Sequence, residues 1–524
     1  MLSLRKLALL FLIFIGISHI LIGSETDSIL YFLFRSFVRI SLAYFFCVIV
    51  ALPVALLITH SKRAKKFLFP IIDIGQSLPI LTFMPFAFLI VINYFPFGEI
   101  NVEIVSIFLL MTSMLWAIIY AFVEGINKIG KDIIDVASLY SLKGFSYIKH
   151  IVLPSSAQAL VSASITSVGG GWYFVIAAEY LSFGTQTFVL PGIGSYMLQA
   201  ISEMKYLEMG IALFFFIALV TIIQTQVWNR LLNGLNKRTD DIFELIVDMS
   251  SYFLAICERI IMLSGASNFL DKHLKPAHVK AIERITPAYL PISLFILLGI
   301  FLYLGFYDAH TLLTASFLTS LRIFAAYLIS IFWTTAAALY LIEKRHLIDK
   351  LTPIFNVLQS VPAVSIFPLV ALITINIFGD IGLELAAIIL LMTGMQWYLI
   401  FNMLRAVSSI PQEYDDVGRL FAQKTLDRIN HVYLPYLAGP ALFASIEAIG
   451  GGWNATIVSE YIFYDGQPHY VLGLGSLLNL LALKGDVYGI IAVTLAMVLL
   501  VTFSNVFIWQ TLINKLRRAK EENK

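Results

Sequence analysis

Four ionisable side chains lie inside long apolar runs of the sequence, where an unpaired charge is costly. Glu179 and Glu460 each end an apolar run, and Arg39 and Arg322 lie a few residues inside two others. Ionisable groups in such surroundings are usually paired and often functional. We therefore predict two ion pairs, Arg39–Glu179 and Arg322–Glu460. They would serve as gate or scaffold elements, or would only hold helices together. A charge-swap double at Arg39 and Glu179 should then restore the function that either single change loses.

Both acids follow a run of glycines. The stretches GGGWYFVIAAEY and GGGWNATIVSEY begin at positions 169 and 450. Three consecutive glycines lower helix propensity, so they predict close helix packing, local unwinding or a pathway lined by backbone. The residues of these stretches that we take as candidate pathway or gate residues, besides the acids, are Gly170, Trp172, Gly451 and Trp453.

Residues for catalysis or metal binding are missing from the sequence. It has no G-x-x-x-x-G-K-[ST] phosphate loop and no H-E-x-x-H pair. The only two cysteines, Cys47 and Cys257, exclude a disulfide framework and a cysteine-based metal site. We predict that the chain is not an enzyme, that it has no catalytic or metal-binding residues and that it binds no cofactor itself.

The composition is that of a membrane protein. Of 524 residues, 59% are hydrophobic and 13% are charged, and the mean hydropathy is +0.86. Apolar runs long enough to cross a bilayer as helices recur along the chain. The predicted fold is an all-α polytopic membrane protein, with lipid and not nucleic acid around it. The twelve predicted spans are 7–22, 32–59, 68–95, 103–123, 155–182, 207–230, 287–306, 315–342, 351–378, 383–405, 436–463 and 487–513.

The orientation follows from the short loops. Lys and Arg gather in alternate loops, for example at 62–66 and 344–345, while the other loops carry few of them. The positive-inside rule then places both termini in the cytoplasm of a multi-pass protein of the cell (inner or plasma) membrane. The run 7–22 is predicted as a span and not as a cleaved signal peptide, because no small-x-small site precedes Ser24. The charged stretch 231–286 is predicted as a cytoplasmic or interfacial linker.

The two halves of the chain repeat each other. QSLP at 76–79 matches QSVP at 359–362, an offset of 283 (359 − 76). GGGW at 169–172 matches GGGW at 450–453, an offset of 281 (450 − 169). The repeat predicts two parallel six-helix halves, 1–230 and 287–524, in one pseudo-dimeric chain, with a shared pathway at their interface.

One polar segment also occurs twice. Asp135–Pro154 reads DVASLYSLKGFSYIKHIVLP and Asp416–Pro435 reads DVGRLFAQKTLDRINHVYLP. An acid, Ala two places on and a closing Leu-Pro resemble the EAA loop of binding-protein-dependent ABC importer permeases. Two prolines six residues apart occur at 79 and 85 and again at 362 and 368. They resemble the P-x-x-x-x-x-P-L region of the nitrate/taurine branch of that family. In this chain Asp replaces the usual Glu, Val136 and Val417 replace the first Ala, and Ser141 and Ala422 stand at the family's glycine position.

The resemblance implies a type I-like permease that imports a small anion such as nitrate, a sulfonate or bicarbonate. It implies two cytoplasmic ABC ATPase subunits that hold ATP and Mg²⁺, and an extracytoplasmic substrate-binding protein. The loops at 131–154 and 412–435 would couple to the ATPases. The matched positions are Asp135, Ala137, Ser141, Gly144, Leu153 and Pro154 in the first copy and Asp416, Gly418, Ala422, Leu434 and Pro435 in the second. A secondary transporter with parallel six-helix repeats remains the alternative, and a polytopic enzyme or scaffold is disfavoured by the missing catalytic residues.

Overall fold

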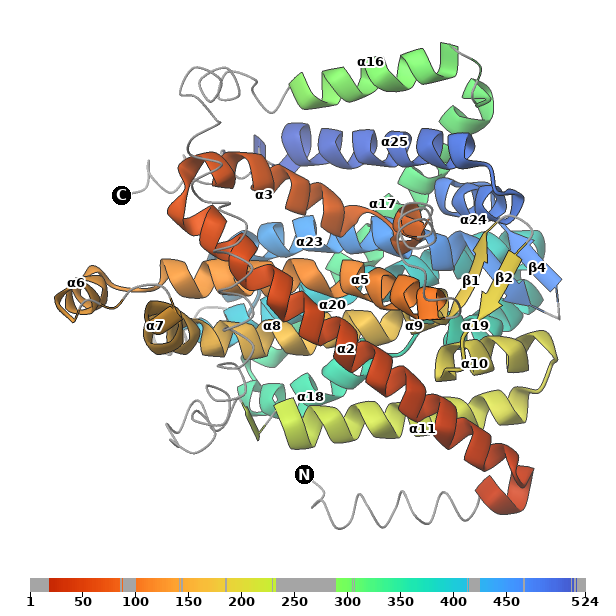
Figure 1. Cartoon of the computed structure of the whole chain (residues 1–524), viewed down its shortest axis with the longest axis horizontal. Coiled ribbons are helices and arrows are strands. Elements are labelled where there is room, and N and C mark those ends of the chain that lie inside the picture. The colour runs from red at the N-terminus through yellow and green to blue at the C-terminus, as the bar shows by residue number, and fades with distance from the viewer. Residues whose placement is uncertain are drawn as a thin grey trace.

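The structure is a computed structural model of the chain in which helices run nearly parallel to one long direction (Figure 1). Eight helices of the described part are long and apolar enough to cross a membrane. They fit eight of the twelve predicted spans, which supports the polytopic all-α prediction. The residues that the structure describes are 18–84, 87, 100–140, 142, 145–183, 186–228, 230–231, 289–303, 305, 307–411, 413, 425–464, 467–509, 511–512 and 515.

The first half is made of helices, with one β-hairpin between α9 and α10. Its elements are α2 (Glu25–His60), α3 (Lys62–Ser77), η1 (Ile80–Phe83), α5 (Ile100–Asn127), α6 (Lys131–Leu139), α7 (Phe145–Tyr147), η2 (Ile148–Val152), α8 (Leu153–Tyr173), α9 (Val175–Glu179), β1 (Tyr180–Phe183), β2 (Gln186–Val189), α10 (Ile193–Ser202), α11 (Tyr206–Ile223) and η3 (Gln224–Trp228).

The second half repeats this order. Its elements are α16 (Tyr289–Tyr303), α17 (Ala309–Ile342), η4 (Arg345–Leu347), α18 (Ile348–Leu358), α19 (Ala363–Phe378), η5 (Gly379–Ile381), α20 (Gly382–Ser409), α22 (Thr425–Arg428), η6 (Ile429–Tyr433), α23 (Leu434–Glu460), β3 (Tyr461–Tyr464), β4 (Gln467–Tyr470), α24 (Leu474–Lys484), α25 (Val487–Phe503) and η7 (Ser504–Trp509). The predicted span 7–22 and the linker 231–286 lie almost wholly outside the described residues.

The longest helices exceed the thickness of a bilayer. α2 has 36 residues and α17 has 34, so each is about 50 Å long at about 1.5 Å per residue. Such helices must tilt in the bilayer or extend beyond it, and α2 crosses its neighbours obliquely (Figure 1). α17 begins at a defined residue because the Asp308 carboxylate caps it, accepting the Thr311 N–H at 2.7 Å.

Two predicted spans, 68–95 and 351–378, are not single helices. α3 ends at Ser77, and Leu78 before Pro79 is extended (φ −83°, ψ 134°). In the second half α18 ends at Leu358 and α19 begins only after Pro362. Proline disfavours helical backbone in the residue before it, so the repeated Gln-Ser-x-Pro breaks each span into two pieces. The breaks leave Gln359 and Ser360 buried between helices.

The Leu-Pro that closes each polar segment lies in the first turn of α8 or α23, and helical backbone already precedes it. The helical backbone already starts at α7 in the first half and at α22 in the second, and continues through the π-turns η2 and η6. Pro154 and Pro435 have no N–H to donate to the preceding turn, and a π-turn accommodates such a gap. The helix from α7 through η2 into α8, and likewise from α22 through η6 into α23, is therefore one continuous rod.

The predicted spans 155–182 and 436–463 end earlier than expected. Their helices stop at Glu179 and Glu460, and antiparallel hairpins follow, pairing Tyr180 with Val189 and Tyr461 with Tyr470. Each hairpin brings the chain back beside the acid: the Leu190 N–H donates to the Glu179 carbonyl at 2.9 Å. The hairpins lie together at the end of the molecule opposite α6 (Figure 1).

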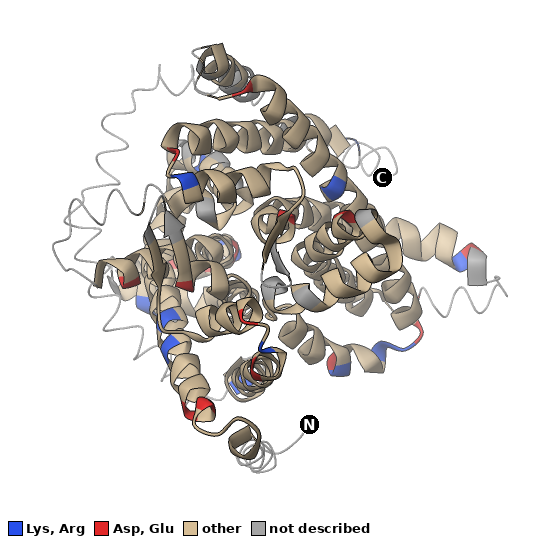
Figure 2. Cartoon of the chain, turned by 90° about the vertical axis from the view of Figure 1, so that its right-hand side faces the viewer, with Lys and Arg blue, Asp and Glu red and all other residues tan. Residues whose placement is uncertain are grey.

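The two halves pack reciprocally and share one apolar core. α3 of the first half contacts α23 and α25 of the second, and α18 contacts α8 and α11 in return. The largest buried cluster draws on both halves, with Trp172 and Phe215 from the first and Leu391 and Met497 from the second. Charged residues are sparse among these helices when seen from the hairpin end (Figure 2).

The reciprocal packing can be tested by cross-linking Ser77 of α3 to Gly450 of α23. A Cβ built on Gly450 lies 3.8 Å from the Ser77 Cβ, which is within the range of disulfides. The double variant Ser77→Cys, Gly450→Cys, made in a chain whose two native cysteines are replaced by serine, should form a disulfide under mild oxidation. With a protease site inserted in the predicted linker 231–286, the cleaved halves should migrate together on a non-reducing gel.

Reducing agent should separate the halves, and either single cysteine should fail to join them. Halves that separate in the oxidised double variant would contradict the packing of α3 on α23.

Candidate functional site

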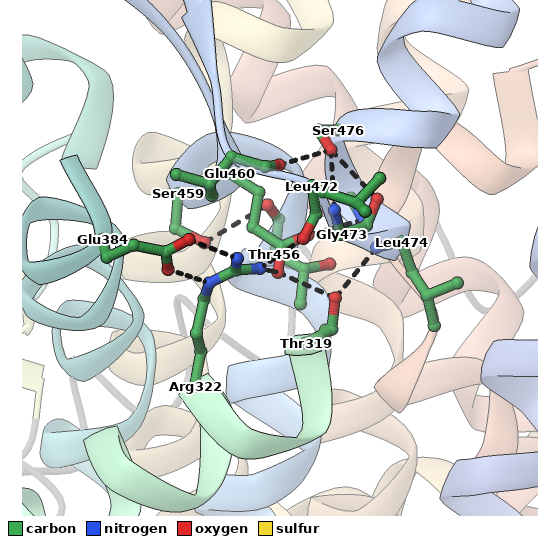
Figure 3. Close-up of polar contacts among 12 residues, drawn as sticks. Thr319, Arg322, Glu384, Thr456, Ser459, Glu460, Leu472, Gly473, Leu474 and Ser476 are labelled. Atoms are coloured by element: carbon green, nitrogen blue, oxygen red, sulfur yellow. Dashed lines mark hydrogen bonds and ion pairs between the residues drawn. The ribbon is translucent and has the colours of Figure 1, made fainter. Parts of the chain in front are cut away.

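A salt-bridge network around Arg322 occupies the hairpin end of the second half (Figure 3). The Arg322 guanidinium donates from Nε and Nη2 to the two oxygens of Glu384, at 2.5 and 2.8 Å. Its Nη1 donates to Glu460 Oε1 at 2.9 Å and to the Leu472 carbonyl at 2.9 Å. Arg322 is 4% exposed and Glu460 is fully buried. The guanidinium is thus saturated by two carboxylates and a carbonyl, as a buried cation requires.

The Glu460 carboxylate also binds the start of α24. Its Oε2 accepts the Gly475 N–H at 2.8 Å, and its Oε1 accepts the Thr319 hydroxyl at 2.8 Å. Free N–H groups and the helix dipole make a helix N-terminus a favourable place for a carboxylate. A Cβ on Gly473 would overlap this carboxylate, so only glycine fits there.

The first half builds the same network with Arg39. Nε and Nη2 of Arg39 donate to Glu103 at 2.8 and 2.9 Å, and Nη1 donates to Glu179. Glu179 also accepts the Ser36 hydroxyl at 2.5 Å and the Gly194 N–H at the start of α10 at 2.8 Å. The two predicted ion pairs, Arg39–Glu179 and Arg322–Glu460, are therefore present. Each forms part of a larger network.

The two networks differ in their number of guanidinium groups. Arg35 donates to Glu103 at 2.6 Å and adds a second guanidinium to the first network. Its counterpart in the second half, at the offset of 283, is Leu318. Two guanidinium groups thus face two carboxylates in the first half, whereas Arg322 alone faces Glu384 and Glu460. The Glu384 side chain is correspondingly more open, at 44% exposure against 25% for Glu103.

Sequence reasoning missed two pairs of network residues, although the repeat carried a signal for both. Glu103 and Glu384 match at the offset of 281, and Ser36 and Thr319 match at 283. A search for polar residues duplicated in register at the ends of apolar runs would have found them. Each network pins the long helix that carries its arginine to three other segments. In the first half these are α5, α9 and the start of α10.

The first glycine of each GGG run packs against the broken span of the other half. A Cβ on Gly450 would lie 2.9 Å from the Ser77 Oγ, and one on Gly169 would lie 3.1 Å from the Ser360 Oγ. Glycine at these positions lets α8 and α23 approach the opposite half closely, because a Cβ there would crowd the serine hydroxyl. We call this contact surface between the halves the seam.

The other predicted residues of the glycine stretches pack within their own half. A Cβ on Gly170 would lie 3.5 Å from the Ser113 carbonyl, and one on Gly451 would overlap the Gly394 carbonyl. Trp172 and Trp453 are 1% and 4% exposed, and the Trp172 ring packs edge-on against Phe216. The structure therefore places both tryptophans in the core.

The first polar segment contains α6, which projects from the molecule at the end opposite the hairpins (Figure 1). Asp135 and Ala137 lie on α6, and Ala137 is its only buried residue. Leu139 is 81% exposed and the adjoining Tyr140 is 77% exposed. Leu153, Pro154, Leu434 and Pro435 begin α8 and α23. The other predicted coupling positions, Ser141, Gly144, Asp416, Gly418 and Ala422, lie outside the described residues.

Metal chemistry finds no support in the described ranges. No group of three or more His, Cys, Asp or Glu side chains there is arranged to hold a metal ion. The described ionisable groups at the hairpin end connect helices to one another.

The networks change the expected result of a charge swap. In Arg39→Glu, Glu179→Arg, the new carboxylate would face Glu103 and the new guanidinium would face the Gly194 N–H at a helix start. Both contacts are repulsive. The double should therefore be no more stable than either single variant, as measured by the apparent Tm of the purified protein in detergent. A double that regains the wild-type Tm would contradict the network.

Removal of Arg39 should be far more damaging than removal of Arg35. Arg39→Ala leaves buried Glu179 without a cation and should cost about 3–5 kcal/mol. Arg35 is 39% exposed, so Arg35→Ala should cost about 1 kcal/mol or less. Thermal unfolding of the two variants side by side compares a buried and an exposed guanidinium that bind the same Glu103. An equal decrease in Tm for the two variants would contradict the expected effect of burial on the strength of these ion pairs.

Comparison with known proteins places this fold in a family. The model for "Binding-protein-dependent transport system inner membrane component" matches twice, at residues 47–241 and 327–518. No solved structure matches the chain.

Individual relatives are similar over part of the chain. A nitrate import permease protein of Synechococcus elongatus is 27% identical over 143 residues, 27% of this chain and 48% of the relative. A bicarbonate transport system permease protein of Synechocystis sp. is 23% identical over 177 residues, covering 34% and 59%. A glycine betaine/proline betaine transport system permease protein of Escherichia coli is 23% identical over 171 residues, covering 32% and 43%.

The chain thus spans about half the length of these relatives, whereas the family model covers most of both halves. Its two matches cover most of the two sets of helices that pack reciprocally, and Arg39 and Arg322 lie just before the matched residues. The chain belongs to the family of inner membrane components of binding-protein-dependent transport systems, with the family unit present twice.

Proposed function

We propose that the chain is the permease of an ATP-driven ABC importer, with both membrane-spanning halves fused. The observation that carries the proposal is the double family match on two halves that complete each other's packing. In this arrangement the translocation pathway runs along the seam, where α8 and α23 meet the broken spans of the opposite half. Movement of the halves along this seam would alternate access to the pathway.

The ATPase subunits would dock at the α6 end. Lys and Arg in the loops indicate that this end is cytoplasmic. α6 presents apolar side chains there, including Val136 at 50% and Leu139 at 81% exposure. An exposed apolar patch of this kind favours a protein partner. Because the end of the polar segment, from α7 onward, continues as one rod into α8, a push passed from α6 to α7 would reach the seam.

The remaining partners and the cargo follow from the family. ATP and Mg²⁺ would be held by two ATPase subunits, and a binding protein would deliver solute at the hairpin end. Two relatives are named for nitrate and bicarbonate, so the proposed cargo is a small solute with an anionic group. The two salt-bridge networks would hold the hairpin end together as scaffold, or as part of a gate, while the pathway opens.

Co-purification tests the docking site. Val136→Glu, Leu139→Glu on α6 should abolish co-purification of an ABC ATPase from the native cells, because two charges would enter an apolar contact. The matched control is Val189→Glu on β2, an exposed apolar residue at the opposite end (52% exposed), which should leave the ATPase bound.

An ATPase that stays bound to the α6 variant would count against docking there. Uptake into proteoliposomes that contain only this chain and an ion gradient would favour the secondary transporter instead.

A further inference from the structure

Arg35 places a charge on an exposed face of α2. Its side chain is 39% exposed. Tyr31, Val38 and Leu42 lie on the same face of the helix, because along this series each residue is three or four positions from the next. All three are exposed. Arg35 therefore interrupts an exposed aromatic and apolar stripe with a guanidinium group.

This face of α2 is on the perimeter of the molecule. The elements that α2 contacts most are α3, α5, α8, α10 and α11, which all belong to the first half, and α2 crosses the front of the molecule in Figure 1. On α17 the counterpart of Arg35 is Leu318, between the exposed residues Phe317 and Leu321. Both helices are apolar enough to span a membrane, so their exposed faces meet lipid.

Arg35 lies at the level of the lipid headgroups on the hairpin side. Its Nη2 donates to Glu103 Oε1 at 2.6 Å, and Glu103 is in the first turn of α5. α5 has 28 residues and is thus about 42 Å long at about 1.5 Å per residue. A bilayer with its headgroup regions is about 40–45 Å thick, so the first turn of α5 reaches the headgroups. A lipid-facing arginine at this level has phosphate groups within reach.

The salt-bridge network does not require Arg35. In the second half Arg322 alone binds both Glu384 and Glu460, with Leu318 at the position of Arg35. In the first half both Glu103 oxygens already accept from Arg39. Among the described residues Arg35 donates to Glu103 alone, which leaves its Nε and Nη1 donors unused. A charged donor that the fold does not need, on a lipid-facing surface, calls for an anionic ligand there.

We propose that Arg35 and the face of α2 around it bind a membrane phospholipid through its phosphate. The guanidinium donates to the phosphodiester oxygens, a pairing that arginine geometry favours. Tyr31 lies towards the headgroup, as aromatic residues do at membrane interfaces, and Val38 and Leu42 contact the acyl chains. Because the second half has Leu318 in place of Arg35, only the first half carries this site. The site lies on the perimeter and is separate from the proposed pathway.

The test counts lipids bound to the purified full-length chain by native mass spectrometry. The delipidated chain in detergent is titrated with dioleoylphosphatidylglycerol, or with dioleoylglycerol, which has the same acyl chains and no phosphate. Compared with the wild type, Arg35→Leu should retain one phosphatidylglycerol fewer, because the Kd of this site rises about tenfold or more when a charged contact is lost. Leu318→Arg should retain one more. Dioleoylglycerol should not be retained at this site, and added inorganic phosphate should not displace the lipid.

The matched control is Lys205→Leu, which removes an exposed cation at the hairpin end that is not on α2 and should retain as many lipids as the wild type. The Tm of each variant without lipid reports its folding. The proposal would be overturned by an unchanged lipid number in folded Arg35→Leu, by no gain in folded Leu318→Arg, or by equal retention of dioleoylglycerol. Displacement of the lipid by inorganic phosphate would also overturn it, since the site would then bind free phosphate.

Discussion

A buried guanidinium must satisfy all its donors, and this constraint organises the hairpin end of the molecule. Arg39 and Arg322 are almost fully buried, so each needs carboxylates from other elements within hydrogen-bond reach. Glu179 and Glu460 in turn need more donors than one arginine supplies, and the N–H groups at the starts of α10 and α24 provide them. The hairpins are what bring those helix starts back to the acids. The long helices, hairpins and short helices at this end therefore hold their positions through two hydrogen-bonded centres.

The opposite requirement applies along the seam, where the contacts are small and carry no charge. Glycine on α8 or α23 meets serine at a break that proline makes in the other half. Such contacts bring backbones close without long side chains that interlock. Salt bridges thus join the helices within each half, whereas small-residue contacts and a shared apolar core join the two halves. This division suits halves that move as rigid units.

The two halves repeat the same salt-bridge network. The networks match position for position, with Thr319 in place of Ser36 and Leu318 in place of Arg35, because each half has to stabilise the same hairpin end.

The sequence alone determined the membrane class, the repeat and the pairing of Arg39 with Glu179, because hydropathy, register and depth along a helix are properties of a linear chain. It did not reveal Glu103 and Glu384 as partners, the proline breaks as the surface that receives the GGG runs, or the hairpins after Glu179 and Glu460. The tertiary structure decided these points because each depends on which helices become neighbours. Glu103 shows the difference: the sequence presents one acid at the start of an apolar run, and only the packing of α5 against α2 shows that this acid binds Arg35 and Arg39.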